Sequence, residues 1–381
     1  QTKFPNTSFI NNRVNIERCH NMNAFMPRIE ITLSQIEHNA RTLSELYGQQ
    51  GISLMGVSKA VLGEPLIAEA MIRGGVKFIA DSRLENIQRM RNARISAQFV
   101  LLRTAPSQAE SIIENVDISL NTELDTLEKL NYYAARQNKI HQIILMVEMG
   151  DLREGIMPDD IFLFIKKVLD LPQLKIIGLG CNLACYGGIK PDEQKMRQLS
   201  ALTEAVEKKF QIHLSLISGG NSANYEWYKS TKNVGRINNL RLGESILLGC
   251  ETVQGQAIPK LHTHAFKLIA EVIESKVKPC LPFGKIGRDA FGNIPVFRST
   301  YPKGDRDRHR RAIVALGKQD TLISGLSPNQ DLEILGSSSD HLLLDCKNSY
   351  LKVGVGVNFN LDYGSLLTAM TSPFIKKQFI K

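Results

Sequence analysis

The sequence lacks any apolar run approaching the roughly 18 residues that a membrane-spanning helix requires. Its first 26 residues also lack the apolar core of a secretory signal peptide and are rich in Asn and other polar residues. We therefore expect no association with a membrane, and we expect residues 1–26 to form a loosely ordered N-terminal extension.

Cysteine is scarce, and its spacing does not favour a metal site or a dense disulfide framework. The chain has six cysteines, and the one close pair, Cys181 and Cys185, lies in an apolar segment without a second pair to complete a zinc site. Scattered cysteines of this kind are typical of reduced thiols. The pattern predicts a cytoplasmic protein without a bound metal.

Positive charge exceeds negative charge by nine, but it is not concentrated on one segment. The densest basic run, residues 303–311, has acidic residues mixed in and no interleaved aromatic residues. We interpret this run as a solvated loop and expect no nucleic-acid partner. A modest positive field can still attract an anionic cofactor.

Between residues 27 and 255, short β-branched runs alternate with amphipathic helical stretches. Eight strands, most of them followed by a helix, are typical of an α/β fold with a parallel (β/α)8 TIM-type barrel. A doubly wound open sheet is the alternative, but it usually has a Gly-rich turn after its first strand, where this chain has Ser58–Val61. The predicted strands are Ser53–Val57, Phe78–Ala80, Gln98–Leu102, Ile118–Leu120, Ile143–Glu148, Ile176–Cys181, Leu214–Ile217 and Asn239–Leu242.

The pattern changes after residue 255. Five segments between Ala265 and Asn358 alternate apolar and polar residues and are separated by Gly, Pro and Ser. This pattern predicts a C-terminal all-β domain over residues 256–381.

Polar residues follow several of the predicted barrel strands, at the end where barrel enzymes build their sites. Lys59 follows the first strand, Ser218–Ser222 follows the seventh, and Arg241 lies in the eighth. The small residues of Ser218–Ser222 would let backbone N–H groups approach an anion, although an ordinary turn is equally expected there. A lysine, a phosphate cradle and an arginine around one barrel mouth fit the outline of pyridoxal phosphate.

The side chain of Lys59 has two interpretations. An amine at a desolvated barrel mouth beside another cation loses its proton more readily, which condensation with an aldehyde requires. Alternatively, the lysine only extends from a strand end to solvent, as many barrel lysines do.

The order of motifs resembles that of a known family. Met55–Ala60 resembles the cofactor-lysine motif of the alanine racemase family, which comprises fold-type III pyridoxal-phosphate enzymes with a barrel followed by a β domain. Over residues 27–375 the matching segments resemble the ornithine racemase branch more closely than alanine racemase itself. The further matches, in order, are Phe78–Arg83, Asn121–Asp125, Met149–Gly155, Asn182–Gly187, Ser218–Ser222, Asn239–Ser245 and Ser337–His341.

The resemblance implies the roles of individual residues. Lys59 would hold pyridoxal 5'-phosphate covalently and act as a base on one face of the substrate α-carbon. Arg241 would hydrogen-bond the pyridine nitrogen, and Arg153 would lie near the substrate carboxylate. The remaining implied contacts are Asn182, Asn221, Ser222, Gly243, Glu244 and Tyr363 for the cofactor and Ser339 for the substrate. Tyr363 could equally be a strand aromatic in the core of the β domain.

The sequence departs from the family at the second acid–base group. Racemisation needs such a group on the opposite face of the α-carbon. In the family a tyrosine from the partner's β domain does this, oriented by a barrel histidine, but the matching positions here are Phe283, or less well Phe291, and Asn182. A homodimer with a site completed by the partner's β domain is nevertheless implied. The candidate replacements are Asp289 and Asp340, followed by His341, Cys185 and Tyr186.

The resemblance implies a racemase of ornithine first, with alanine, serine or another basic amino acid as alternatives. A carboxylate would be needed for the distal ammonium of ornithine, and the candidates are Glu148, Asp151, Glu154 and Glu244. A related decarboxylase is less favoured because the chain has no Glu-Pro-Gly-Arg phosphate segment. A non-catalytic pyridoxal-phosphate carrier is disfavoured by the predicted β domain.

Overall fold

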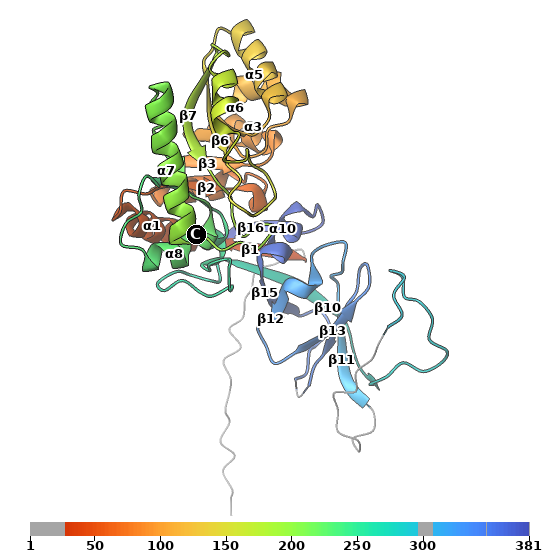
Figure 1. Cartoon of the computed structure of the whole chain (residues 1–381). Helices are drawn as coiled ribbons and strands as arrows, with labels where there is room; N and C mark the ends of the chain where they lie inside the picture. The colour runs from red at the N-terminus through yellow and green to blue at the C-terminus, as the bar shows by residue number, and fades with distance from the viewer. Residues whose placement is uncertain (1–26, 296–307, 348, 381) are drawn as a thin grey trace, which may run out of the picture.

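The computed structural model describes residues 27–295, 308–347 and 349–380 (Figure 1). The extension expected at residues 1–26 lies outside the described residues, as do residues 303–307 of the basic run. The remainder of that run, residues 308–311, begins strand β11 (Arg308–Val314). Among the described residues, every helix is too short or too polar to span a lipid bilayer.

Eight parallel strands close into a barrel, which confirms the predicted fold class. Their interior is filled by apolar side chains such as Met55, Val100, Ile118 and Ile144, all almost fully buried. Because helices cover the outside, each strand is buried on both faces and reads as a nearly continuous apolar run. The strands are β2 (Ser53–Val57), β3 (Phe78–Asp81), β4 (Gln98–Leu101), β5 (Ile118–Asn121), β6 (His141–Met146), β7 (Leu174–Gly180), β8 (Leu216–Ser218) and β9 (Asn239–Leu242).

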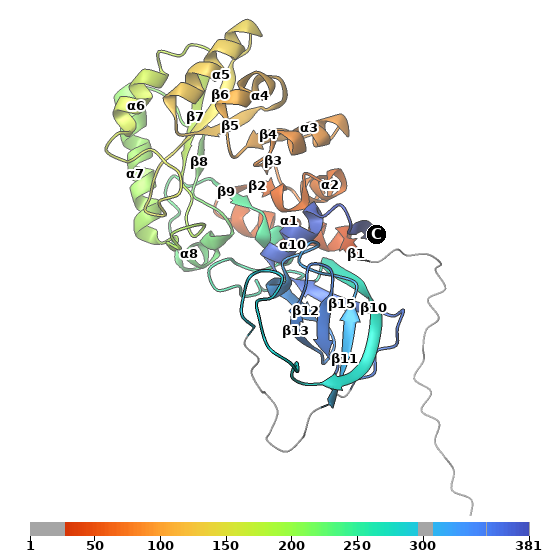
Figure 2. The same cartoon turned by 90° about the vertical axis from the view of Figure 1, so that its right-hand side faces the viewer.

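Helices surround the barrel (Figure 2). Their apolar side chains belong to the buried core. In α5, for example, Leu127, Leu130 and Ala134 recur at helical spacing and are fully buried. The longest helix, α7, begins after Asp192, whose carboxylate accepts a hydrogen bond from the backbone N–H of Lys195 at 2.8 Å. The barrel helices are α1 (Leu33–Gly48), α2 (Pro65–Arg73), α3 (Leu84–Asn92), α4 (Ala109–Asn115), α5 (Leu124–Arg136), α6 (Ile161–Val168), α7 (Glu193–Phe210), α8 (Tyr225–Ser230) and α9 (Glu244–Leu248).

A separate, mostly antiparallel sheet follows the barrel, as the sequence predicts. Its main path runs β12-β15-β10-β11-β14-β13, and both figures show it at one end of the barrel. Its strands include β10 (Phe266–Pro279), β11, β12 (Leu326–Pro328), β13 (Glu333–Ser337), β14 (Leu342–Asp345), β15 (Gly356–Leu361) and β16 (Lys376–Ile380).

The two ends of the described chain meet in this sheet. Strand β1 (Arg28–Thr32) precedes the barrel in sequence but pairs with β10 and, in parallel, with β16. Residues 28–32 therefore belong to the β-sheet rather than to the barrel that the sequence predicts over residues 27–255.

Helix α10 (Tyr363–Thr371) connects the β domain to the mouth of the barrel. It begins after Asp362, whose Oδ1 accepts a hydrogen bond from the backbone N–H of Ser365 at 2.8 Å. The helix packs against the short 3-10 helix η1 (Lys59–Val61), and the figures show it between barrel and sheet. This contact brings the start of α10 close to Lys59.

Candidate active site

A cavity of about 770 Å³ opens at the carboxyl ends of the barrel strands. Most of the residues predicted for a site line it, although they come from distant parts of the chain. They are Lys59, Arg153, Asn182, Asn221, Ser222, Arg241, Gly243, Glu244 and Tyr363. This is the end at which (β/α)8 enzymes place their chemistry.

Lys59 lies two residues after the end of β2 and is half-buried at the cavity wall. Burial lowers the pKa of its amine, because desolvation disfavours the charged form. The guanidinium groups of Arg153 and Arg241 lower this pKa further, while the acidic groups of Cys185 and Asp81 act in the opposite direction. The site therefore favours a neutral, nucleophilic amine more than solvent does.

The guanidinium of Arg241 is buried, and three neighbours hold it in place. It donates to Ser218 Oγ at 2.6 Å, to the Cys181 carbonyl at 2.7 Å and to Asn182 Oδ1 at 3.4 Å. Cys181 and Asn182 follow β7, Ser218 is the last residue of β8, and Arg241 lies in β9. The cation is thus fixed at the junction of three strands.

The segments after β8 and β9 form one continuous cradle. Asn221 Oδ1 accepts a hydrogen bond from the backbone N–H of Ala223 at 2.8 Å. Ser222 Oγ accepts one from the backbone N–H of Ser245 at 3.1 Å, which links the two segments. Gly220 has a φ of +141°, and a Cβ there would lie 2.3 Å from Asn224 Oδ1. Only glycine allows this close turn.

Two of the carboxylates predicted to bind a substrate ammonium accept hydrogen bonds from backbone N–H groups instead of lining the cavity. Glu148 Oε1 accepts hydrogen bonds from the backbone N–H groups of Gly150 and Leu152 at 2.6 and 3.1 Å. The carboxylate of Asp151 is buried and holds the segment after β7. Neither residue lines the cavity, whereas Glu154 and Glu244 do. Glu154 forms an ion pair with Arg153.

Tyr363 is the first residue of α10, not a strand residue in the core of the β domain. Its side chain lines the cavity. Burial raises the pKa of the Tyr363 hydroxyl to about 12, and the nearby carboxyl of Glu244 contributes to the shift. The phenol therefore stays protonated and can donate a hydrogen bond into the cavity.

Three residues predicted from the sequence do not line the cavity of their own chain: Asp289, Ser339 and Asp340. Asp289 accepts hydrogen bonds from the backbone N–H groups of Phe291 and Asn293 in an exposed turn. Asp340 is also exposed and accepts from Ser339 Oγ at 3.2 Å and pairs with His341 Nδ1 at 2.8 Å. Within one chain each of these groups contacts residues of its own turn, and none lines the cavity that contains Lys59.

The cavity also contains polar groups that the sequence analysis assigned no role. Asn121, which ends β5, and Thr252 both line it. Asn121 Oδ1 and Thr252 Oγ1 are buried without a hydrogen-bond partner among the described residues, as is the amide nitrogen of Asn182. Glu123, two residues beyond Asn121, contributes a further carboxylate to the wall. Asn121 lies at the end of a predicted barrel strand, and this position in the sequence could have identified it as a residue of the cavity wall.

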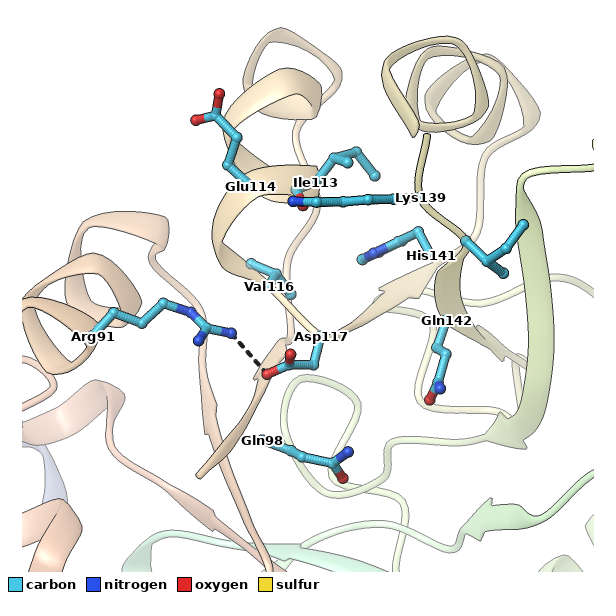
Figure 3. A pocket seen from close by; sticks show the side chains of 10 residues that line it. Arg91, Gln98, Ile113, Glu114, Val116, Asp117, Lys139, His141 and Gln142 are labelled. Atoms are coloured by element: carbon cyan, nitrogen blue, oxygen red, sulfur yellow. Dashed lines mark hydrogen bonds and ion pairs between the residues drawn. The ribbon is translucent and has the colours of Figure 1, made fainter. Parts of the chain in front are cut away.

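A second cavity of about 400 Å³ lies at the opposite, amino end of the strands (Figure 3). Arg91 and Asp117 form an ion pair there at 2.8 Å. Burial lowers the pKa of His141 to about 4, so the imidazole is neutral and shares a 2.8 Å hydrogen bond with Ser119. These groups already have structural partners. Buried polar atoms of Asn121, Asn182 and Thr252 without a partner among the described residues line the cavity at the carboxyl end, which is the candidate active site.

Comparisons with known proteins agree with this geometry. The sequence profile of the alanine racemase N-terminal domain matches residues 31–250. An ornithine racemase of Acetoanaerobium sticklandii is 37% identical over 359 residues, which cover 93% of this chain and 99% of that protein. A lysine racemase of Thermotoga maritima is 37% identical over 360 residues, covering 93% and 98%.

A solved structure extends the likeness to the fold of most of the chain. The alanine racemase of Streptomyces lavendulae superposes with a TM-score of 0.71 at 16% identity, covering 93% of this chain and 97% of that one. The profile match covers more than half of the chain, and the two relatives align with nearly all of it. The resemblance seen in the motifs is confirmed: this chain belongs to the alanine racemase family.

Proposed function

We propose that this chain is a pyridoxal-phosphate-dependent amino-acid racemase with ornithine as its main substrate. The observation that carries the proposal is the position of Lys59, whose amine lies in the same cavity as Arg241 and the cradle of Ser222. The family and the relatives that act on ornithine and lysine support the same activity. Lysine is the second candidate substrate.

The residues of the cavity fit pyridoxal phosphate. Lys59 supplies an amine for the aldehyde, and Arg241 supplies a fixed donor for the pyridine nitrogen. Ser222, Tyr363 and the backbone of Gly243 supply donors for the phosphate. Thr252 also lines the cavity, and its buried hydroxyl has no hydrogen-bond partner among the described residues. A bound anion with several acceptor oxygens would satisfy such donors.

Racemisation requires the chain to remove a proton from the α-carbon on one face and to return one on the other. When bound, pyridoxal phosphate supplies an electron sink for the pair left on the α-carbon. The amine of Lys59, with its lowered pKa, is suited to accept and return the proton on its own face. Because the Arg241 guanidinium keeps its protons, it would leave the nitrogen of a bound pyridine ring unprotonated, which would limit the strength of that sink.

The cavity has charges for both ends of a basic amino acid. Arg153 can bind the α-carboxylate, since a guanidinium matches the geometry of a carboxylate. Glu123 lines the wall and can receive the distal ammonium, together with the unpartnered Oδ1 of Asn121, whereas Glu154 is already paired with Arg153. Alanine and serine would leave these acceptors unpaired, which favours ornithine or lysine.

An exposed apolar segment supports a homodimer. Residues 280–295 follow β10 and extend beyond the sheet in Figure 1. Five large apolar side chains within it are 47 to 89% exposed: Leu281, Phe283, Ile286, Phe291 and Ile294. Such a patch on one segment is typical of a protein–protein contact. In a twofold dimer this segment would reach the partner's cavity and cover its mouth.

Glu244 imposes a pH dependence on the site. Burial raises the pKa of its carboxyl to about 7, and the carboxylates of Asp362 and Glu251 contribute in the same direction. Between about pH 4.5 and 7 the folded protein therefore holds a proton that the unfolded chain has released. A neutral carboxyl at this position avoids repulsion of a phosphate at the cradle.

Catalysis is tested by proton exchange in deuterated water. We expect both enantiomers of ornithine to gain deuterium at the α-carbon and to interconvert, faster than alanine or serine does. Lys59→Ala should abolish racemisation together with the visible absorbance of the bound cofactor, while the exposed Lys229→Ala should change neither. An absence of α-exchange with every amino acid tested, or release of carbon dioxide instead, would contradict the proposed function.

The dimer is tested by placing a charge in the apolar segment. Phe283→Asp should shift the protein from dimer to monomer in sedimentation velocity, because a carboxylate in an apolar contact loses its hydration. Tyr132→Asp, on the outer surface of α5, is the matched control and should leave the dimer intact. The proposed contact is wrong if Phe283→Asp sediments as the wild-type protein does.

The role of Glu244 is tested by the stability of the cofactor-free protein. Glu244→Gln removes a carboxyl whose ionisation opposes folding, so the variant should be more stable than the wild type by up to about 3 kcal/mol above pH 8. The difference should shrink as the pH falls through 7 and vanish near pH 4. Thermal unfolding across this range measures it, with the exposed Glu226→Gln as control. A difference independent of pH would contradict a raised carboxyl pKa.

A further inference from the structure

We propose that the thiol of Cys185 is the second acid–base group, acting on the face of the substrate α-carbon opposite Lys59. This inference rests on the proposed racemase function. Phe283 matches the position of the family's catalytic tyrosine, but its phenyl ring cannot transfer a proton. Cys185 would supply the acid–base group that this position lacks. This assignment also differs from a site completed by an acid of the partner, because the thiol belongs to the same chain as Lys59.

Cys185 and Lys59 reach the same cavity from different parts of the barrel wall. Lys59 follows β2 and Cys185 lies beyond β7, and both line the cavity. In the closed barrel, β8 and β9 separate these two strands. Arg241 lies in β9, between the thiol and the amine along the wall. The two groups are close enough for Cys185 to be the largest charge influence on the pKa of Lys59 after burial.

The backbone around the thiol is held in place by Asp151. Its buried carboxylate accepts hydrogen bonds from the N–H groups of Cys185 at 3.2 Å, Tyr186 at 2.9 Å and Ile189 at 3.4 Å. Asn221 Nδ2 donates to the sulfur of Cys185 at 3.4 Å. A donor to sulfur stabilises a thiolate, and a fixed backbone keeps the group in position for reaction.

A neighbouring amide indicates that a polar ligand belongs beside this thiol. Asn182 is nine-tenths buried and lines the cavity three residues before Cys185. Its Oδ1 accepts from Asn221 and Arg241, but its Nδ2 has no partner among the described residues. A buried donor without a partner is costly, so an acceptor on a bound molecule is expected here. A carboxylate of an amino acid is such an acceptor.

The proton transfers balance between the two groups. In one direction the Cα–H bond would break as the amine of Lys59 takes the proton, with bound pyridoxal phosphate supplying a sink for the electron pair left on the α-carbon. The S–H bond of Cys185 would then break as that pair forms a new C–H bond on the other face. This leaves an ammonium and a thiolate, and the reverse direction exchanges their roles. A thiol suits both tasks because its proton is far more labile than that of a hydroxyl.

Other groups of this chain do not occupy this position. Tyr186, the next residue, is 76% exposed and does not line the cavity. Asp289 and Asp340 lie in exposed turns of the β domain. They would reach a substrate only in the cavity of a partner subunit. The competing hypothesis is therefore that one of these partner acids, and not Cys185, is the second acid–base group.

The test uses the cofactor-loaded enzyme in deuterated water with each ornithine enantiomer. Cys185→Ser should lower racemisation by at least about 100-fold, the usual contribution of one acid–base group. It should keep the visible absorbance of the cofactor, and one enantiomer should still exchange its α-proton through Lys59 without inverting. Tyr186→Phe, in the same segment, should racemise ornithine at a rate close to that of the wild type.

A second measurement does not depend on turnover. Iodoacetamide should alkylate Cys185 in the loaded enzyme, and ornithine should slow this reaction as followed by peptide mass. Three results would overturn the inference: near wild-type racemisation by Cys185→Ser, loss of cofactor absorbance and of all exchange together, or a defect confined to Asp289→Asn or Asp340→Asn. Failure of the wild-type enzyme to exchange any α-proton would instead overturn the racemase function itself.

Discussion

The buried guanidinium of Arg241 is the interaction on which the rest of the site depends. It ties β9 to Ser218 at the end of β8 and to the Cys181 carbonyl after β7. A buried cation at this junction has two consequences. It fixes the wall of the cavity against which a cofactor ring could lie, and it disfavours the charged form of Lys59. Removing it would leave Ser218 and the carbonyl without their partner and Lys59 with an amine that is harder to deprotonate.

Charge is distributed so that protons can move in both directions across the cavity. The two arginines lower the pKa of Lys59, while Cys185 acts against them. A thiolate and an ammonium formed in one half of the reaction would stabilise each other until the reverse transfer. After β6, backbone N–H groups occupy the oxygens of Glu148 and Asp151, so these carboxylates do not bind in the cavity. The hydrogen bonds of Asp151 also hold the segment that carries Cys185.

The barrel could be predicted from the sequence because each strand is short, apolar and bounded by turn residues, and because strand ends converge in a closed barrel. This rule alone brought Lys59, Ser222 and Arg241 together. It could not reveal that β1 joins the distant β10 and β16, since that pairing depends on contacts across most of the chain. It also could not show which acids are occupied by backbone N–H groups, because free and occupied carboxylates look alike in sequence. A contact of Asp289 or Asp340 with a partner's cavity would depend on a second copy of the chain.

The central claim is that Lys59 is the attachment point of pyridoxal phosphate at the mouth of the barrel. Borohydride reduction of the cofactor-loaded protein, followed by peptide mass mapping, tests it most directly. The account predicts a stable phosphopyridoxyl mass on the peptide that contains Lys59 and on no other lysine peptide. A label on another lysine, or an unlabelled protein after full loading, would contradict it.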